Sequence, residues 1–205
     1  MSGNDDRDED VDLMLSLARG NDAAFDVLFS RWGGRLQRFL ERMVSDGATA
    51  EELVQETFLR VYRARRGYQP ESRFSTWLYR IATNLALNEL RRPRRRRPHA
   101  STDDEAAPIR LTSTLSRPDA IAHARLVVVG LEAAFEALPE RQRIALWLAA
   151  VEGQSYAEVA ASLGTSEKSV KSLVHRARST LAAGLPAACV GGVAGVSGKK
   201  EGVNT

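Results

Sequence analysis

The chain has 205 residues, enough for one large or two small domains, and 43% of them are hydrophobic, which is ordinary for a globular protein. No apolar run is long enough to span a bilayer, and the acidic N-terminus lacks the basic and apolar regions of a signal peptide. A single cysteine, Cys189, excludes an intrachain disulfide and suits a reducing compartment, so we expect a cytoplasmic protein. The three histidines are scattered without metal-ligand spacing, and we expect no metal and no cofactor.

The net charge is +3, but its distribution along the chain is uneven. Six arginines occupy seven positions between residues 91 and 97, which leaves 23 of the 29 basic residues against 26 acidic ones elsewhere. The remainder of the chain is therefore not basic throughout, and any contact with nucleic acid must come from local patches.

Residues 1–20 predict an acidic, flexible start followed by a short helix over residues 11–18. Residues 21–92 predict a helical domain. Its first helix, which begins near Asn21, is long and amphipathic, and the glycines at 33 and 34 predict a bend or a close approach within it.

A second helix of this domain is predicted to begin at a capping box formed by Thr49 and Glu52. Its apolar positions fall on one face. The opposite face carries exposed polar and apolar groups: Gln55, Glu56, Leu59 and Arg63.

A third helix is predicted from Ser75, as its cap, to Arg91, and beside its core stripe runs a second line of side chains within a band of about 80°. The line contains an aromatic ring, two amides and two cations: Trp77, Arg80, Asn84, Asn88 and Arg91. Such groups suit contact with nucleic acid, because arginines bind phosphates, amides read base edges and aromatic rings stack on bases. The alternative is that Trp77 belongs to the core and the amides are ordinary surface groups. The preceding loop favours the first interpretation, since its aromatic and basic side chains suit capture of an unstacked base: Tyr68, Arg73 and Phe74.

Residues 93–118 have the composition of a linker, and residues 186–205 that of a disordered tail. For the arginine tract two interpretations stand equal: it follows nucleic acid, or it is a charged, soluble tether. The tail is too short and too weakly apolar to span a membrane.

Residues 119–185 predict a second helical domain, which contains a helix-turn-helix. Ser155 and Glu158 form a capping box, Gly164 suits a left-handed helix end, and Thr165 or Ser166 can cap the following helix. The buried side of that helix is predicted to hold Val170, Leu173, Val174, Ala177 and Leu181. The opposite, cationic side can enter a major groove. The residues predicted to contact duplex DNA are Ser166, Lys168, Ser169, Lys171, Ser172, His175, Arg176 and Arg178.

No segment alternates with a period of two for long enough to predict a sheet. The fold class expected is therefore all-α: two small helical bundles joined by a flexible basic and polar linker.

Four motifs stand in a fixed order: AEELVQETFLRVYRA, RFSTWLYRIATNLALNEL, LPERQRIALWL and SYAEVAASLG…SVKSLVHRAR. Together they resemble an extracytoplasmic-function (ECF) sigma factor over roughly residues 23–92 and 121–185. The resemblance implies that the first domain docks on the clamp helices of RNA polymerase core and melts the −10 element of a promoter. It also implies that the second domain recognises the −35 element as duplex DNA.

By position, the resemblance assigns polymerase docking to Glu52, Gln55, Glu56 and Leu59, with an ordinary solvated surface as the alternative. It assigns −10 recognition to Tyr68, Arg73, Phe74, Trp77, Arg80, Asn84 and Asn88. Within that set Asn84 matches the base reader, and Arg80 and Asn88 are expected at the DNA backbone.

Three residues depart from the family pattern. Lys168 stands where glycine is frequent, Leu173 where arginine is frequent, and Glu52 where aspartate is usual. Periodicity places Leu173 in the core, so we expect no DNA contact there. The family also implies an anti-sigma factor as a partner. We expect neither membrane insertion nor a small-molecule substrate.

Two other classes of function compete with this prediction. One is a two-domain regulator that binds an operator without joining polymerase. The other is an enzyme, such as a nuclease or a thiol enzyme at Cys189. It is disfavoured because no carboxylate cluster, Cys–His pairing or glycine-rich phosphate loop is apparent.

Overall fold

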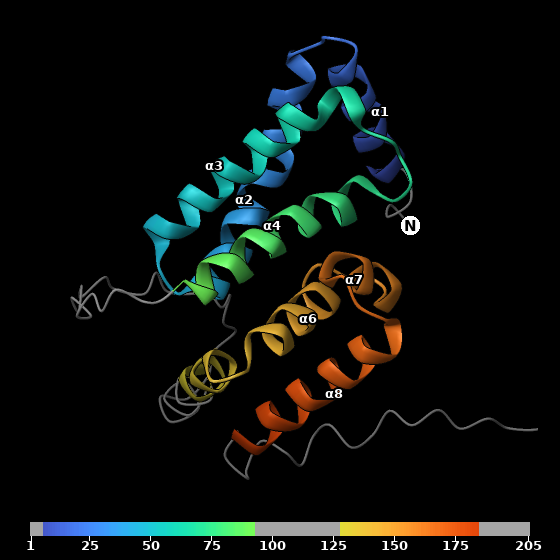
Figure 1. Ribbon diagram of the computed structural model, residues 1–205. Helices are drawn as coiled ribbons and strands as arrows, with labels where there is room; N and C mark the ends of the chain where they lie inside the picture. Colours follow the sequence, from blue (N-terminus) through green and yellow to red (C-terminus); the bar gives the residue numbers. More distant parts are fainter. Residues whose placement is uncertain (1–5, 93–127, 185–205) are drawn as a thin grey trace, which may run out of the picture.

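The computed structural model describes residues 6–92 and 128–184, and all regular structure within them is helical. The first part contains α1 (Asp6–Ala18), α2 (Ala23–Val44), α3 (Gly47–Ala64), the short 3₁₀ helix η1 (Arg65–Gly67) and α4 (Phe74–Arg91). The second contains a helix over residues 128–136, then α6 (Glu140–Ala150), α7 (Tyr156–Leu163) and α8 (Glu167–Gly184). The all-α prediction is confirmed, and the helices form two bundles, one above the other in Figure 1. The predicted linker and tail lie outside the described residues.

The core of the first bundle is built on α2, where apolar residues at helical spacing face α3 and α4. Aromatic rings meet at its centre: Tyr79 lies edge-on to both Phe39 and Trp32, with ring centroids 5.3 and 6.2 Å apart. Helix α2 runs through Gly33 and Gly34 without ending. Phe29 is 45% exposed, so its ring lies at the margin of the buried side of α2.

The acidic start of the chain is more ordered than the sequence predicted, because α1 begins at Asp6 and not at Val11. Asp10 explains the difference. Its carboxylate is buried, accepts a hydrogen bond from Trp32 Nε1 at 3.1 Å, and pairs with Arg31 at 2.6 Å. The sequence therefore predicted that Asp10 is exposed to solvent, whereas in the structure it is buried against Arg31 and Trp32 of the next helix.

Two predicted helix starts are also wrong. Helix α3 is capped by Asp46, whose side chain accepts a hydrogen bond from the Thr49 backbone N–H at 3.1 Å, and not by a Thr49–Glu52 box. Helix α4 begins at Phe74 without any side-chain cap, so Ser75 lies within its first turn.

The helix-turn-helix of the second bundle agrees with its sequence signals. The reciprocal capping box of Ser155 and Glu158 is present, and Gly164 adopts φ = +59°, a left-handed conformation that glycine adopts without strain. The Ser166 hydroxyl accepts a hydrogen bond from Ser169 N–H at 3.2 Å, as a cap does. Val151, just past the end of α6, is 57% exposed.

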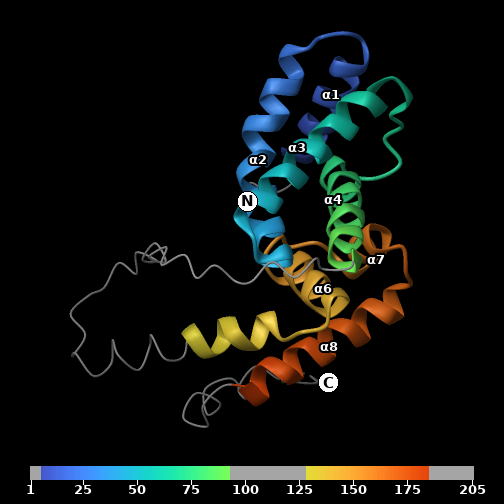
Figure 2. The ribbon, with the colours of Figure 1, turned by 60° about the vertical axis from the view of Figure 1, so that its left-hand side comes forward.

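The two bundles are in contact, whereas the sequence predicted domains whose separation is not fixed. Helix α7 lies along α4, and α6 reaches the end of α2 (Figures 1 and 2). The Ser162 hydroxyl donates to the Thr76 carbonyl at 3.3 Å, and Arg143 donates to the Met43 carbonyl at 2.8 Å. Buried apolar residues from both bundles form one cluster.

Candidate nucleic-acid and protein interfaces

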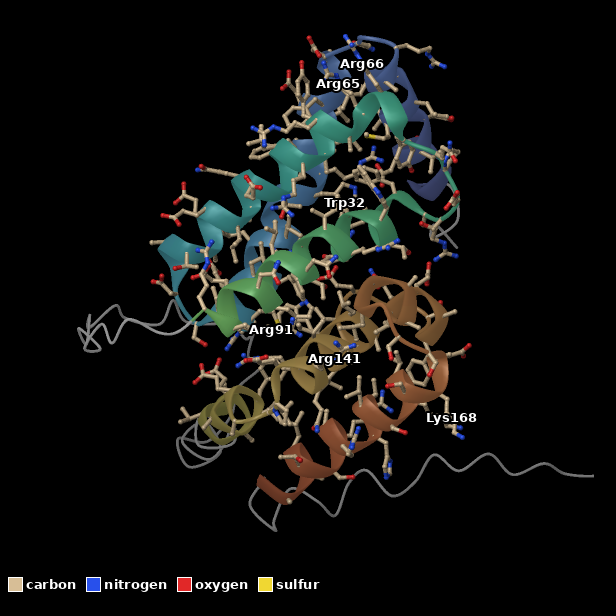
Figure 3. All side chains as sticks on the ribbon, viewed as in Figure 1. Trp32, Arg65, Arg66, Arg91, Arg141 and Lys168 are labelled. Atoms are coloured by element: carbon tan, nitrogen blue, oxygen red, sulfur yellow. The ribbon has the colours of Figure 1, made fainter. Side chains whose placement is uncertain are left out.

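Helix α8 presents a polar and cationic face on the outside of the second bundle. Its buried side is held by Val170, Leu173, Val174 and Ala177, each less than 9% exposed. The side chains predicted to contact duplex DNA are exposed, except that Ser169 is half-buried: Ser166, Lys168, Lys171, Ser172, His175, Arg176 and Arg178. Figure 3 shows Lys168 at the start of α8, directed away from the first bundle. The arrangement suits insertion into a major groove, with cations placed for phosphates on either side.

The structure shows the surroundings of two residues that depart from the family pattern, Leu173 and Lys168. Leu173 is 8% exposed, so the prediction that it belongs to the core is confirmed. Lys168 is exposed in the first turn of α8, where its ammonium group can reach a phosphate.

Helix α4 carries the second polar line on a face that α7 does not cover. Four of its five members are exposed: Arg80, Asn84, Asn88 and Arg91. The fifth, Trp77, is half-buried. Its ring contacts those of Tyr68 and Phe74, with centroids 5.0 and 6.0 Å apart. Trp77 therefore belongs partly to the core, and the amides and arginines form the accessible part of this face.

The loop before α4 does not offer the open aromatic pocket that the sequence predicted. Phe74 is 1% exposed and packs against Trp32, with ring centroids 6.2 Å apart, and Tyr68 is 9% exposed. Burial raises the pKa of the Tyr68 hydroxyl. In this arrangement neither ring is available to stack on a base, so their contact with DNA stays a prediction.

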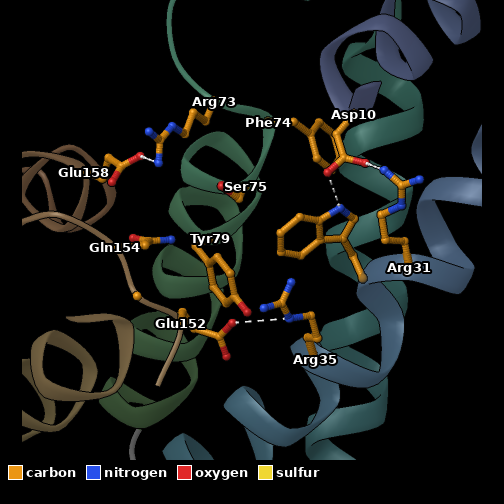
Figure 4. A pocket seen from close by; sticks show the side chains of 12 residues that line it. Asp10, Arg31, Arg35, Arg73, Phe74, Ser75, Tyr79, Glu152, Gln154 and Glu158 are labelled. Atoms are coloured by element: carbon orange, nitrogen blue, oxygen red, sulfur yellow. Dashed lines mark hydrogen bonds and ion pairs between the residues drawn. The ribbon is translucent and has the colours of Figure 1, made fainter. Parts of the chain in front are cut away.

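Arg73 is exposed, as predicted, but its guanidinium group already has a partner. It pairs with Glu158 of α7, with an N–O distance of 3.0 Å (Figure 4). The residue predicted to contact promoter DNA therefore binds a carboxylate of the other bundle.

Helix α3 turns its polar side outward, as predicted. Glu52 and Gln55 are exposed, and Leu59 is 41% exposed. Glu56 is half-buried and pairs with Arg60 one turn later at 2.7 Å. A surface with one apolar residue among carboxylate and amide groups suits contact with a basic helix of another protein.

Sequence reasoning missed the residues that join the two bundles. Arg143 is 6% exposed, and besides the Met43 carbonyl it contacts the Glu136 carbonyl at 3.2 Å. Burial lowers the pKa of its guanidinium group. No sequence signal distinguished Arg143 from a solvent-exposed arginine, because the carbonyl of Met43 that it contacts lies 100 residues earlier in the chain.

A cavity of about 300 Å³ lies at the boundary between the bundles, near Trp32, Phe74 and Tyr79 (Figure 4).

Within residues 6–92 and 128–184, no three His, Cys, Asp or Glu side chains gather in a way that could hold a metal ion. Among the same residues no helix combines the length and apolarity needed to cross a bilayer.

Comparison with known protein families agrees with this division into two bundles. The model of Sigma-70 region 2 matches residues 28–97, and that of Sigma-70 region 4 matches residues 129–181. These two matches define the class as sigma-70-type proteins.

Similar proteins narrow the class. The chain is 37% identical to the ECF RNA polymerase sigma factor SigE of Mycolicibacterium smegmatis, over 85% of this chain and 67% of the relative. It is 40% identical to the RNA polymerase sigma factor CarQ of Myxococcus xanthus, over 77% and 86% of the two chains. A solved structure of the sigma factor RpoE of Bartonella quintana, in complex with the anti-sigma factor NepR, superposes with a TM-score of 0.58 at 25% identity, covering 78% of this chain and 95% of that one. The chain belongs to the ECF sigma factor family.

Proposed function

We propose that this chain is a dissociable promoter-specificity subunit that binds RNA polymerase core and directs promoter recognition, DNA melting and transcription initiation. The observation that carries this is the pair of exposed polar faces, on α4 and on α8, which belong to two separate bundles. The matches to Sigma-70 regions 2 and 4 divide the chain between the same bundles.

The α8 face is assigned to the −35 element as duplex. Its serines, histidine and cations reach base edges and phosphates from within the major groove. Lys171 and Arg176 suit either phosphate or guanine contact.

The α4 face is assigned to the −10 element after its strands separate. Asn84 is exposed and central on this face, with Arg80 and Asn88 placed for the backbone on either side. Melting would be driven by trapping unpaired bases and not by hydrolysis of a fuel. Because Phe74 and Tyr68 are buried, their part in the trap requires the loop before α4 to rearrange.

The outer side of α3, with Glu52, Gln55, Glu56 and Leu59, is assigned to the clamp helices of polymerase. An anti-sigma factor is proposed as a second partner, since the related sigma factor of Bartonella quintana was solved in complex with one. The chain is proposed to have no catalytic site of its own and to act with polymerase in the cytoplasm, because its relatives are named as sigma factors.

The deciding experiment is transcription in vitro with purified core enzyme and a library of randomised promoters. RNA chains that start at a shared motif only when the protein is added would support the proposal and give the preferred sequence. Failure of core enzyme to bind the protein or to start RNA on any template would overturn it.

The competing regulator that binds an operator without polymerase makes a different prediction for α3. Under our proposal, Gln55→Ala combined with Leu59→Ala weakens binding to core enzyme about tenfold or more and leaves duplex binding by α8 unchanged. An operator-binding regulator would show no dependence on these residues in any assay.

A further inference from the structure

The peptide group between Leu163 and Gly164, at the end of α7, is held at both of its polar ends. Its N–H, on Gly164, donates to the carbonyl of Ala160 within α7. Its C=O, on Leu163, accepts a hydrogen bond from the guanidinium group of Arg141 at 3.0 Å. Arg141 lies in the first turn of α6 and is labelled in Figure 3. Because a peptide group is planar, bonds at both ends fix the orientation of the whole unit.

The Leu163 carbonyl needs a partner from outside its own helix, because α7 ends at this residue. Leu163 is 5% exposed, so water has little access to it. A backbone polar group in such surroundings is costly without a partner. The last carbonyls of a helix also carry partial negative charge, which favours a guanidinium group as the donor. Arg141 therefore supplies a C-terminal cap to α7 from another helix of the same bundle.

Gly164 is the most permissive point of the helix-turn-helix. It adopts φ = +59°, and glycine has more backbone freedom than any other residue. Only Thr165 and Ser166 separate it from α8, which begins at Glu167. The orientation of the bonded peptide group therefore sets the direction in which the chain enters α8.

The first turn of α8 depends on this peptide group more than the later turns do. Of its four residues only Val170 is buried, whereas Leu173, Val174 and Ala177 pack the following turns into the bundle. The same first turn carries Lys168, which is assigned to DNA. Side chains that read a ligand must be held within about 0.5 Å of the productive geometry, so a loose first turn would misplace them.

We propose that Arg141 is a positioning residue for recognition of the −35 element: it holds the α7–α8 turn, and with it the first turn of α8, in the orientation that enters the major groove, and it does not bind DNA itself. The inference rests on the proposed function, because that function assigns α8 to duplex DNA. Arginines of DNA-binding domains commonly contact phosphates, and a guanidinium group has five N–H donors. The test must therefore separate positioning from direct contact.

The test compares the full-length protein with its Arg141→Met variant on two duplexes, by fluorescence anisotropy at several salt concentrations. One duplex is recovered by the wild-type protein from a randomised library, and the other is a scrambled sequence of the same composition. Methionine keeps an unbranched side chain but has no N–H donor. We expect about three- to tenfold weaker binding to the selected duplex, in the range of one net hydrogen bond. Binding to the scrambled duplex and the salt dependence should not change.

A direct phosphate contact gives a different result. It would weaken binding to both duplexes alike and reduce the salt dependence by about one ion, and this outcome would overturn the proposal. Unchanged affinity for the selected duplex would overturn it as well. Arg63→Met removes the same charge from an exposed site of α3 and is the matched control, with no effect expected on either duplex.

A double-mutant cycle with Lys168→Ala tests whether Arg141 acts through α8. If Arg141 places the first turn, Lys168→Ala should weaken binding to the selected duplex less in the Arg141→Met background than in the wild-type protein. Two independent contacts would give additive losses, which would contradict positioning.

Nuclear magnetic resonance of the free protein tests the same step without DNA. In Arg141→Met the backbone amides of Gly164 and Thr165 should shift and their order parameters should fall, while those in the middle of α6 stay unchanged. Unaltered amides at the turn would overturn the proposal. If the wild-type protein selects no duplex, the proposed function fails, whereas these amides still decide whether Arg141 holds the turn. Circular dichroism checks folding, and Arg141→Gln, with a shorter polar side chain, replaces Arg141→Met if that variant does not fold.

Discussion

The two surfaces assigned to DNA differ in how their side chains are held. The α8 face depends mainly on contacts close in sequence, namely the Ser155–Glu158 box, the Gly164 turn and the Ser166 cap. The α4 face depends on distant packing, since Phe74, the first residue of α4, packs against Trp32 of α2, some forty residues earlier in the chain. A surface built from local signals is complete in the free chain, whereas one that depends on distant packing can have its key groups buried until a partner arrives.

The largest expected effect concerns Phe74. If its ring is core, as the structure shows, Phe74→Ala should lower the free energy of unfolding by about 3–5 kcal/mol, through lost burial and the cavity left behind. Chemical denaturation measures this. Phe29→Ala is the matched control, because it removes the same ring from a site that is 45% exposed and should cost clearly less. Equal losses of stability would mean that the Phe74 ring is accessible to solvent at the start of α4, and the contrast between the α4 and α8 faces would be lost.

Arg176→Ala tests the complete α8 face. Loss of a bidentate base contact should weaken binding to the preferred duplex by about 1–3 kcal/mol and relax specificity at one position, whereas loss of a phosphate contact should weaken all duplexes and reduce the salt dependence by about one ion. Fluorescence anisotropy at several salt concentrations separates the two. Arg63→Ala on α3 is the control. Unchanged affinity for every duplex would remove Arg176 from the interface.

Asn84→Ala tests the α4 face, whose aromatic residues are buried in the free chain. With polymerase core present, we expect about a tenfold loss of open promoter, detected by permanganate reactivity of unpaired thymines, because a lost base contact costs on the order of 1–2 kcal/mol. Asn88→Ala, expected at the DNA backbone, should weaken opening less and without base preference. Normal melting in the Asn84 variant would argue against base capture on α4.

The smallest expected effect concerns the start of α3. Because Asp46 is its cap, Asp46→Ala should cost about 1 kcal/mol of stability. Glu52→Ala should change it by less than about 0.5 kcal/mol, as surface substitutions usually do. Thermal unfolding of both variants shows which residue caps α3. A larger loss of stability in Glu52→Ala than in Asp46→Ala would favour the Thr49–Glu52 capping box that the sequence predicted.

Features that depend on contacts close in sequence were predicted from the sequence, and features that depend on distant packing were not. The helices, the helix-turn-helix and the exposed members of both DNA faces follow from periodicity and caps, which act within a few residues. The wrong start at Thr49 arose because Asp46, three residues earlier, also offers a side-chain cap. The wrong start at Ser75 arose because α4 begins without any side-chain cap. The burial of Asp10, Phe74 and Arg143 could not be predicted, because each is decided by a partner on another helix. In a sequence, a charged residue that is buried against such a partner looks the same as one that faces water.

The bond between Asp10 and the Trp32 indole gives the chain an internal reporter. Removing residues up to Asp5 should leave the tryptophan emission unchanged, since the carboxylate and its helix stay in place. Removing five more would withdraw the carboxylate and uncover the ring, and the emission should shift to longer wavelength. Asp10 therefore marks how far the amino terminus can be trimmed before the first bundle opens to water.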